Sequence, residues 1–260
     1  MEKGFTLVIP LYNKEHCIRQ TLDSVLNNHG EYPFKCIIID DDSTDGSSQI
    51  AEEYDMKYPD VFQYYKIKHH GNKSPVNARN VGIKIADTKY IGFLDADDEI
   101  CAGFIDRGCT FLDEHPEYSM YGNGFISYNV KENPDIYTYL TYTSNDVDNF
   151  KKYVNSNATN VHFCANIYIT EYVKDNLFTD VWGEDTVFRM KYVYKHPNIY
   201  VDKDNWFSIM YKPENSESVG WIYQRTDKHW LIEIFDNIKN DLPGFEYQYF
   251  INENGEIEIR

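Results

Sequence analysis

The sequence predicts an α/β fold built on a mostly parallel central sheet flanked by helices, and three observations support this. Short apolar runs alternate with helix-type periodicity through the first half of the chain, an order that gives right-handed crossovers and parallel pairing. The 260 residues suit one large domain, because single cores grow to roughly 250 residues before they split. Polar clusters follow three of the expected strands, at the sheet edge where open α/β folds bind ligands.

Three segments have the pattern of buried strands, because they are short apolar runs bounded by polar residues or proline. The first run stops at Pro10 and the last at Asp95, and a further strand is expected at residues 62–67. The expected strands are residues 5–9, 36–39, 62–67 and 90–94. Between them, apolar positions recur on one helical face in three segments. The expected helices are residues 15–30, a segment carrying Ile50, Ala51 and Tyr54, and residues 77–86.

The second half of the chain is less regular. We expect a helix carrying Phe104 and Leu112, strand material at 118–130, a helix at 184–194 and a terminal hairpin around the Asn-Gly turn at 254–255. No clean linker separates these elements. We therefore expect one main domain at 1–210, which would carry any catalytic site. It would be followed by an extension at 211–260 whose helix and hairpin pack on the same core.

Charge and composition restrict the class of protein. Asp and Glu number 42 against 25 Lys and Arg, giving a net charge of −17 without a basic stripe, which argues against nucleic-acid binding. Apolar residues make up 42%, so wholesale disorder is excluded. The five cysteines form no CxxC pair and are expected to be reduced, mostly buried thiols. Neither a signal peptide nor a membrane-spanning run is visible, so we expect a cytoplasmic protein.

The polar cluster after the second expected strand allows several interpretations. Residues 41–52 place oxygen-bearing side chains as a calcium loop does, with Gly46 at the sixth position. A strand precedes this loop where the template has a helix, and Ser48 stands where an apolar residue belongs, so a calcium site is disfavoured. Capping of the following helix is a simpler interpretation, although it leaves Asp40 and Asp41 unexplained.

The cluster after the fourth expected strand, FLDADD at 93–98, places Asp95 and Asp97 two positions apart. Phosphatases use an Asp-x-Asp motif on their first strand, and receiver domains need a downstream lysine that has no convincing counterpart here. A divalent cation is the better fit, because Mn²⁺ and Mg²⁺ are held by a few carboxylates together with phosphate oxygens. The pattern thus indicates a Mn²⁺ or Mg²⁺ site at Asp97, with Asp95, that neutralises a diphosphate.

Five motifs, taken in order, resemble glycosyltransferase family 2, the inverting enzymes of the GT-A fold. They are VIPLYNKE at 8–15, IDDDSTDGS at 39–47, ARNVGI at 78–83, FLDADD at 93–98 and GEDTVFR at 183–189. Each motif is modest alone, but their order and spacing agree with the family over residues 5–189. The resemblance implies a GT-A type nucleotide-binding fold with a less regular C-terminal region on the acceptor side.

The resemblance also implies roles for the matching residues. The nucleotide-sugar would contact Pro10, Tyr12, Glu15, Asp41, Asn72, Arg79, Asp95 and Ala96. Tyr12 would lie against uracil and ribose, while Asp41 would accept the base N3–H. Asp185 would be the general base that takes the acceptor proton, and Glu184 would orient the acceptor or Asp185. A helix-dipole role for Glu184 and Asp185, and a surface ion pair for Arg79, are the structural alternatives.

Several positions depart from the family pattern. Glu214 stands where the family often has a histidine after the base helix, which puts a His contact with metal or diphosphate in doubt. Asp42 stands where Gly or Asn is usual. His69 and His70 suit an exposed or nucleotide-side loop better than a metal site. The Gln-x-x-Arg-Trp signature of processive synthases is absent, which favours transfer of a single sugar.

The sequence therefore predicts an inverting, metal-assisted glycosyltransferase of hexosyl or N-acetylhexosaminyl type. Its donor would be a nucleotide-sugar, most simply a UDP-sugar, and its acceptor a hydroxyl on a glycan, lipid-linked or protein partner in surface glycan or glycoconjugate synthesis. A catalytically inactive relative that binds nucleotide or glycan is one alternative. A sugar-phosphate nucleotidyltransferase is another, but it needs a Gly-rich basic loop after the first strand, which residues 10–15 do not offer.

Overall fold

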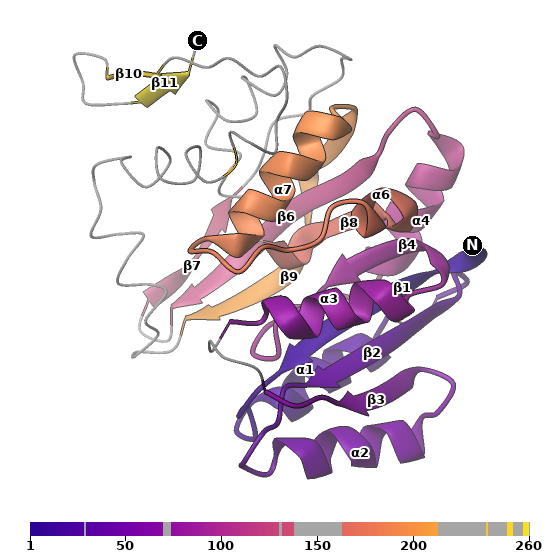
Figure 1. Ribbon diagram of the computed structural model, residues 1–260. Helices are drawn as coiled ribbons and strands as arrows, with labels where there is room; N and C mark the ends of the chain where they lie inside the picture. The colour runs from indigo at the N-terminus through magenta and orange to yellow at the C-terminus, as the bar shows by residue number, and fades with distance from the viewer. Residues whose placement is uncertain are drawn as a thin grey trace.

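The computed structural model describes residues 1–28, 30–69, 74–129, 132–137, 163–212, 238, 249–251 and 257–259. Its centre is a sheet of nine strands in the order β3-β2-β1-β4-β8-β6-β9-β5, with β7 paired to β6 (Figure 1). The first four strands are parallel to one another. They are β1 (Glu2–Leu11), β2 (Phe34–Asp40), β3 (Phe62–Lys66) and β4 (Thr88–Phe93). This half of the sheet confirms the predicted α/β fold.

The remaining strands of the sheet pair mostly in antiparallel fashion. They are β5 (Glu99–Ile100), β6 (Met120–Asn129), β7 (Glu132–Tyr137), β8 (Asn166–Ile169) and β9 (Ile199–Lys212). β8 lies between β4 and β6 and is antiparallel to both, while β9 is parallel to β6. Parallel pairing is thus concentrated in the half with regular strand and helix signals.

The helices alternate with the strands through the first half, as predicted. They are α1 (Ile18–Leu26), α2 (Ser47–Lys57), α3 (Val76–Ile85), α4 (Phe104–Glu114), α6 (Thr170–Lys174) and α7 (Glu184–Lys195), with a short 3-10 turn at Phe163–Ala165. Figure 1 shows α3 and α7 in front of the sheet and α1 behind it. The helices therefore cover both faces.

The side chains of β1 alternate between two buried clusters, one on each face of the sheet. Leu7 and Ile9 pack with Leu22 of α1 on one face, whereas Val8 packs with Ile83 of α3 on the other. All five are shielded from solvent. This alternation is the two-residue period of a strand buried on both sides.

Close contact between α3 and β1 depends on Gly82. A Cβ atom at this position would lie 2.3 Å from the Cγ1 atom of Val8, so only glycine fits. Arg79 precedes Gly82 by three residues and therefore lies on the same helical face. The packing that needs Gly82 thus also directs Arg79 toward the sheet.

The C-terminal part of the chain is described only at a few positions. Ile238 is helical and fully buried in the cluster that includes Val8. β10 (Tyr249–Ile251) and β11 (Ile257–Ile259) form an antiparallel pair, as expected for the terminal hairpin, whose turn lies outside the described residues. β9 runs to Lys212, two residues beyond the expected boundary at 210, and the division into two parts stays a prediction.

Candidate active site

Three parallel strands end at one edge of the sheet and bring distant motifs together. Leu11 is in register with Asp40, and Val8 with Phe93, so the segments after β1, β2 and β4 leave the sheet side by side. β1 continues through Pro10 to Leu11, where we expected it to stop at Pro10. Pro10 fits because pairing with β4 has already ended at Val8, so its missing N–H breaks no bond to β4.

Asp40 is a structural carboxylate. It is fully buried and accepts hydrogen bonds from the Ser43 backbone N–H at 2.8 Å, the Tyr64 hydroxyl at 2.7 Å and the Ser48 hydroxyl. Burial alone would raise its pKa, but these hydrogen bonds, led by that of Ser48, outweigh burial and lower the pKa. Asp40 therefore fixes the loop from β2 to α2 rather than contacting a ligand.

One carboxylate oxygen of Asp41 is hydrogen-bonded and the other is not. Its Oδ2 lies 2.9 Å from Nδ1 of His69, which must donate because a carboxylate only accepts. The His69 ring stacks on Tyr12, with centroids 5.4 Å apart and planes 16° apart. The Oδ1 atom is buried and has no hydrogen-bond partner among the described residues. Asp41 and Tyr12, both predicted to contact a base, are thus neighbours around one histidine ring.

The backbone after β2 explains the departure at Asp42. Asp42 has a φ of 64°, in the left-handed region, where Gly or Asn is more easily accommodated than other residues. Asn13, in the segment after β1, has a φ of 50° and accepts the Thr44 N–H at 2.8 Å. The two loops are therefore fixed to each other through local backbone geometry.

Glu15 takes part in the same connection. Its carboxylate accepts the Gly46 N–H at 2.6 Å, and its own N–H donates to Asp45 at 3.2 Å. The observed contacts of Glu15 are therefore with the β2–α2 loop, and its predicted place in a nucleotide cleft stays a prediction. Asp45 also caps α2 by accepting the Ser47 N–H, so helix capping explains part of this cluster.

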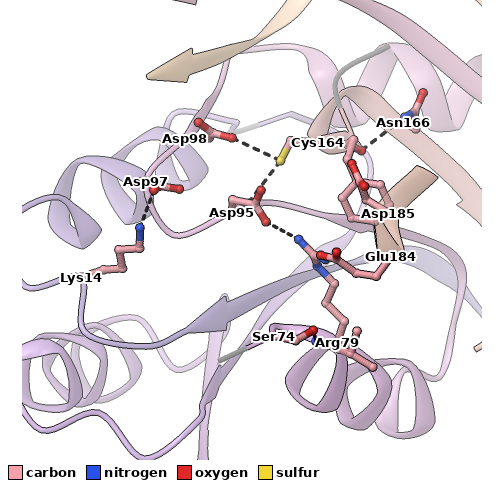
Figure 2. Close-up of polar contacts among 12 residues, drawn as sticks. Lys14, Ser74, Arg79, Asp95, Asp97, Asp98, Cys164, Asn166, Glu184 and Asp185 are labelled. Carbon is pink, nitrogen blue, oxygen red and sulfur yellow. Dashed lines mark hydrogen bonds and ion pairs between the residues drawn. The ribbon is translucent and has the colours of Figure 1, made fainter. Parts of the chain in front are cut away.

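Arg79 joins two motifs that are far apart in the sequence. Its Nη2 donates to Asp95 at 2.7 Å, and its Nη1 donates to Glu184 at 3.0 Å (Figure 2). The side chain is 4% exposed, and its guanidinium lies over the rings of Phe163 and Phe178 at 4.8 and 5.3 Å. Burial would lower the pKa of Arg79, but Asp95 and Glu184 outweigh it and raise the pKa. The guanidinium therefore stays charged and holds α7 beside the end of β4.

The N-terminus of α7 presents the two predicted catalytic carboxylates. Gly183, with a φ of 70°, precedes the helix, and Asp185 accepts the Thr186 N–H at 2.7 Å. Burial and the neighbouring charge of Asp185 raise the pKa of Glu184, although Arg79 opposes this. Figure 2 shows Glu184 and Asp185 together on the side where Asp95 and Arg79 meet. The helix-dipole alternative is compatible with this placement, because both acids lie in the first turn.

The loop after β4 carries three aspartates with different partners. Asp97 pairs with Nζ of Lys14 at 2.5 Å. The thiol of Cys164 donates to Asp98 at 3.5 Å and accepts the Asp95 backbone N–H at 3.2 Å. Figure 2 shows the three aspartates close together, with Lys14 against Asp97 and Cys164 between Asp98 and Asp95.

The donor set fits a hard divalent cation. Ligand atoms of Asp95, Asp98 and Cys164 lie within 4.8 Å of one another. Asp97, the other predicted ligand, is not part of this group and contacts the Lys14 ammonium. Burial, followed by the charges of Asp95 and Asp98, raises the pKa of Cys164 well above 9, so the sulfur stays protonated. Carboxylate oxygens are then the available ligands, which suits Mn²⁺ or Mg²⁺ better than a thiophilic metal.

Some predicted positions cannot be placed, and some contacts were not predicted. Asn72, His70 and Glu214 lie outside the described residues. Ala96 is buried, and its carbonyl accepts the Thr21 hydroxyl at 3.0 Å, which supports the aspartate loop.

Sequence reasoning assigned no role to Lys14 or Cys164. Lys14 stands inside the VIPLYNKE motif, which was the available signal, whereas nothing around Cys164 marks it.

A hollow of about 600 Å³ lies along α4, β6 and β9 and shares no residue with this site. Its most buried acid, Asp202, accepts from Arg107 at 2.9 Å and from the Tyr121 hydroxyl at 2.8 Å. The carboxylate is thus satisfied within the protein. The strand ends, rather than this hollow, hold the motifs that the sequence singled out.

The sheet order and the acidic strand ends define an α/β protein of the GT-A type. The chain belongs to glycosyl transferase family 2, whose family model matches residues 6–176. Staphylococcus aureus TarS 1-349 in complex with UDP-GlcNAc has a similar fold, with a TM-score of 0.71 and 23% identity over 94% of this chain and 68% of that chain. The mannosyltransferase PcManGT from Pyrobaculum calidifontis, in complex with GDP-Man and Mn²⁺, has a TM-score of 0.66 and 17% identity, covering 93% and 65%.

Sequence relatives match shorter segments. The minor teichoic acid biosynthesis protein GgaB of Bacillus subtilis is 38% identical over 43% of this chain and 12% of its own length. The poly(ribitol-phosphate) beta-N-acetylglucosaminyltransferase TarS of S. aureus is 32% identical over 43% of this chain and 19% of its own length. The matched segments thus span less than a quarter of these relatives. Within the described residues, none of the helices is long and apolar enough to cross a membrane.

Proposed function

We propose that this protein transfers a single sugar from a nucleotide-sugar, a UDP-sugar in the simplest case, to an acceptor hydroxyl with inversion. The observation that carries the proposal is the pair of bonds from Arg79 to Asp95 and Glu184. These two bonds place Glu184, at the start of α7, beside Asp95, which would contact the nucleotide-sugar. A hexosyl or N-acetylhexosaminyl group is favoured by TarS, which binds UDP-GlcNAc.

The donor side would be formed by the ends of β1, β2 and β4. Asp41 has a free buried oxygen that can accept the N3–H of uracil, and the Tyr12 ring offers a stacking surface. Asp97, with Asp95, would hold Mn²⁺ or Mg²⁺, and Asp98, which is grouped with Asp95 and Cys164, offers a further carboxylate beside Asp95. When bound, the ion would stabilise negative charge on the departing diphosphate as a Lewis acid. Arg79 would act by holding Asp95 in place.

The acceptor side would be formed by α7. In an inverting transfer the acceptor hydroxyl attacks the anomeric carbon opposite the diphosphate and loses its proton as the bond forms. Asp185 would take that proton, and Glu184, held by Arg79, would position Asp185 or the acceptor. The names of GgaB and TarS concern teichoic acid and poly(ribitol-phosphate), which supports a surface glycan as the acceptor. A cytoplasmic location is a further part of this proposal. So is the division into a catalytic domain at 1–210 and an extension at 211–260.

The test is incubation with Mn²⁺ and a panel of UDP-sugars, followed by detection of released UDP and glycosylated acceptor. Asp185→Asn should reduce transfer by about 10²- to 10⁴-fold, because the proton acceptor is lost, while UDP affinity stays unchanged. A parallel loss of UDP affinity would contradict the role of Asp185. Absence of any turnover by the wild type, with UDP still bound, would favour the inactive-relative alternative.

A further inference from the structure

Lys14 occupies an unusual place between two motifs of the site. It follows β1, yet its Nζ atom lies 2.5 Å from Oδ2 of Asp97 in the loop after β4. Figure 2 shows the Lys14 side chain extended toward Asp97. The two side chains are 34% and 30% exposed, so the pair is accessible from solvent. A cation therefore already sits on the carboxylate to which the proposed function assigns the metal.

The backbone of Lys14 is fixed from a third segment. Its N–H donates to the Ser47 hydroxyl at 2.7 Å, at the start of α2. The anchored backbone leaves the four-carbon side chain as the movable part. Like other lysine side chains, Lys14 carries an ammonium group at neutral pH.

Arg79, which is buried in the same site, is not free to change partners. Both terminal nitrogens of Arg79 are taken by Asp95 and Glu184, and its side chain is 4% exposed. Lys14 is half-buried, has a flexible stem and contacts a carboxylate that a divalent ion would claim. An ammonium is a compact charge with three donors, which suits phosphate oxygens.

We propose that Lys14 is a diphosphate-binding residue that exchanges partners. Its ammonium holds Asp97 in the nucleotide-free protein and moves to the diphosphate oxygens when a divalent cation takes Asp97. This inference rests on the proposed function, because it needs a diphosphate next to Asp97. It predicts that Lys14 competes with the ion and assists the diphosphate, so its removal has opposite effects on the two ligands.

The experiment measures two affinities in the full chain carrying Lys14→Met. Mn²⁺ binding without nucleotide is followed by the electron paramagnetic resonance signal of the free ion. UDP binding in saturating Mn²⁺ is followed by calorimetry, with uridine as the ligand that lacks phosphate. We expect Mn²⁺ to bind about fivefold more tightly and UDP about fivefold more weakly, the scale of a partly exposed ion pair. Uridine binding should not change.

Two variants serve as controls. Lys14→Arg keeps the charge and should stay close to the wild type in both affinities. Lys35→Met removes the partner of Asp87, an ion pair elsewhere on the surface, and should change neither affinity. Thermal unfolding of all variants checks that they are folded.

Opposite shifts in Lys14→Met, restored in Lys14→Arg, support the exchange. A change in only one affinity, a change of both in the same direction, or no change overturns it. These results differ from failure of the proposed function, in which the wild type itself would bind no UDP in the presence of Mn²⁺.

Discussion

The aspartates after β2 and those after β4 lie at the same sheet edge but have different kinds of partner. After β2, neutral donors surround Asp40, and Asp41 is met by a histidine and keeps one oxygen free. After β4, charged groups dominate: Arg79 contacts Asp95, and Lys14 contacts Asp97. The partners therefore distinguish two environments that the residue type alone does not.

This difference suggests how one acidic edge of the sheet would bind a ligand whose two ends differ in chemistry. A carboxylate with a free buried oxygen suits a neutral N–H donor, because an unpaired buried acceptor gains from any donor that reaches it. A row of carboxylates already paired with cations suits a metal ion and the phosphates that it carries. In the proposed function, the β2 end would therefore meet the base and the β4 end the metal diphosphate.

The largest effect should come from the cation that holds the β4 end. In Arg79→Met, the partly exposed Asp95 and Glu184 lose their counter-charge and one charge-assisted hydrogen bond each, and losing one such bond costs about 1.5–3 kcal/mol. We expect a corresponding fall in the urea midpoint of unfolding, and a smaller fall in Arg79→Lys. A loss near 0.5 kcal/mol, the scale of an exposed ion pair, would show that Arg79 does not hold α7 to the sheet.

A smaller loss of stability should follow at the β2 end from Asp40→Asn. This variant weakens the bonds from Ser43, Ser48 and Tyr64, and we expect about 2 kcal/mol at pH 7. Because folding lowers the pKa of Asp40, its stabilising contribution is full above the unfolded value near 4 and is lost as pH falls through the folded value. The gap between wild type and variant should therefore narrow in acid. Urea unfolding at several pH values measures it, and a constant gap would contradict the assignment.

A paired experiment tests whether the ends of β2 and β4 act as separate subsites. Asp97→Ala should weaken UDP binding about tenfold with Mn²⁺ present, or about 1.4 kcal/mol, and should not weaken binding in EDTA, where Lys14 is released from Asp97. Asp41→Ala should weaken uridine and UDP alike, with or without Mn²⁺. Calorimetry with both ligands measures the four combinations. If both variants responded to Mn²⁺ in the same way, the two strand ends would not be separate subsites.

The same comparison shows what the sequence could and could not predict. Strands β1, β2 and β4 were found because strands buried on both faces are continuous apolar runs. The insertion of β8 between β4 and β6 depends on long-range pairing, for which short segments such as Asn166–Ile169 carry no local signal. Residue types located the carboxylates after β2 and β4. They could not show that Cys164, nearly seventy residues later, contacts Asp95 and Asp98, because only folding brings them together.

The smallest effect is expected at His69, and it sharpens the description of the β2 end. His69 makes the two contacts that a uracil ring would make, an N–H bond to Asp41 and a stack on Tyr12. His69→Phe keeps a ring but removes the donor, leaving Asp41 without its partner in the free protein. We expect stability to fall by about 1 kcal/mol and UDP affinity to rise about threefold, because His69 no longer competes with the base N–H for the Asp41 carboxylate. Calorimetry with UDP measures the change, with His69→Asn as the donor-keeping control. Weaker UDP binding in His69→Phe would instead show that the histidine N–H supports the base rather than taking its place.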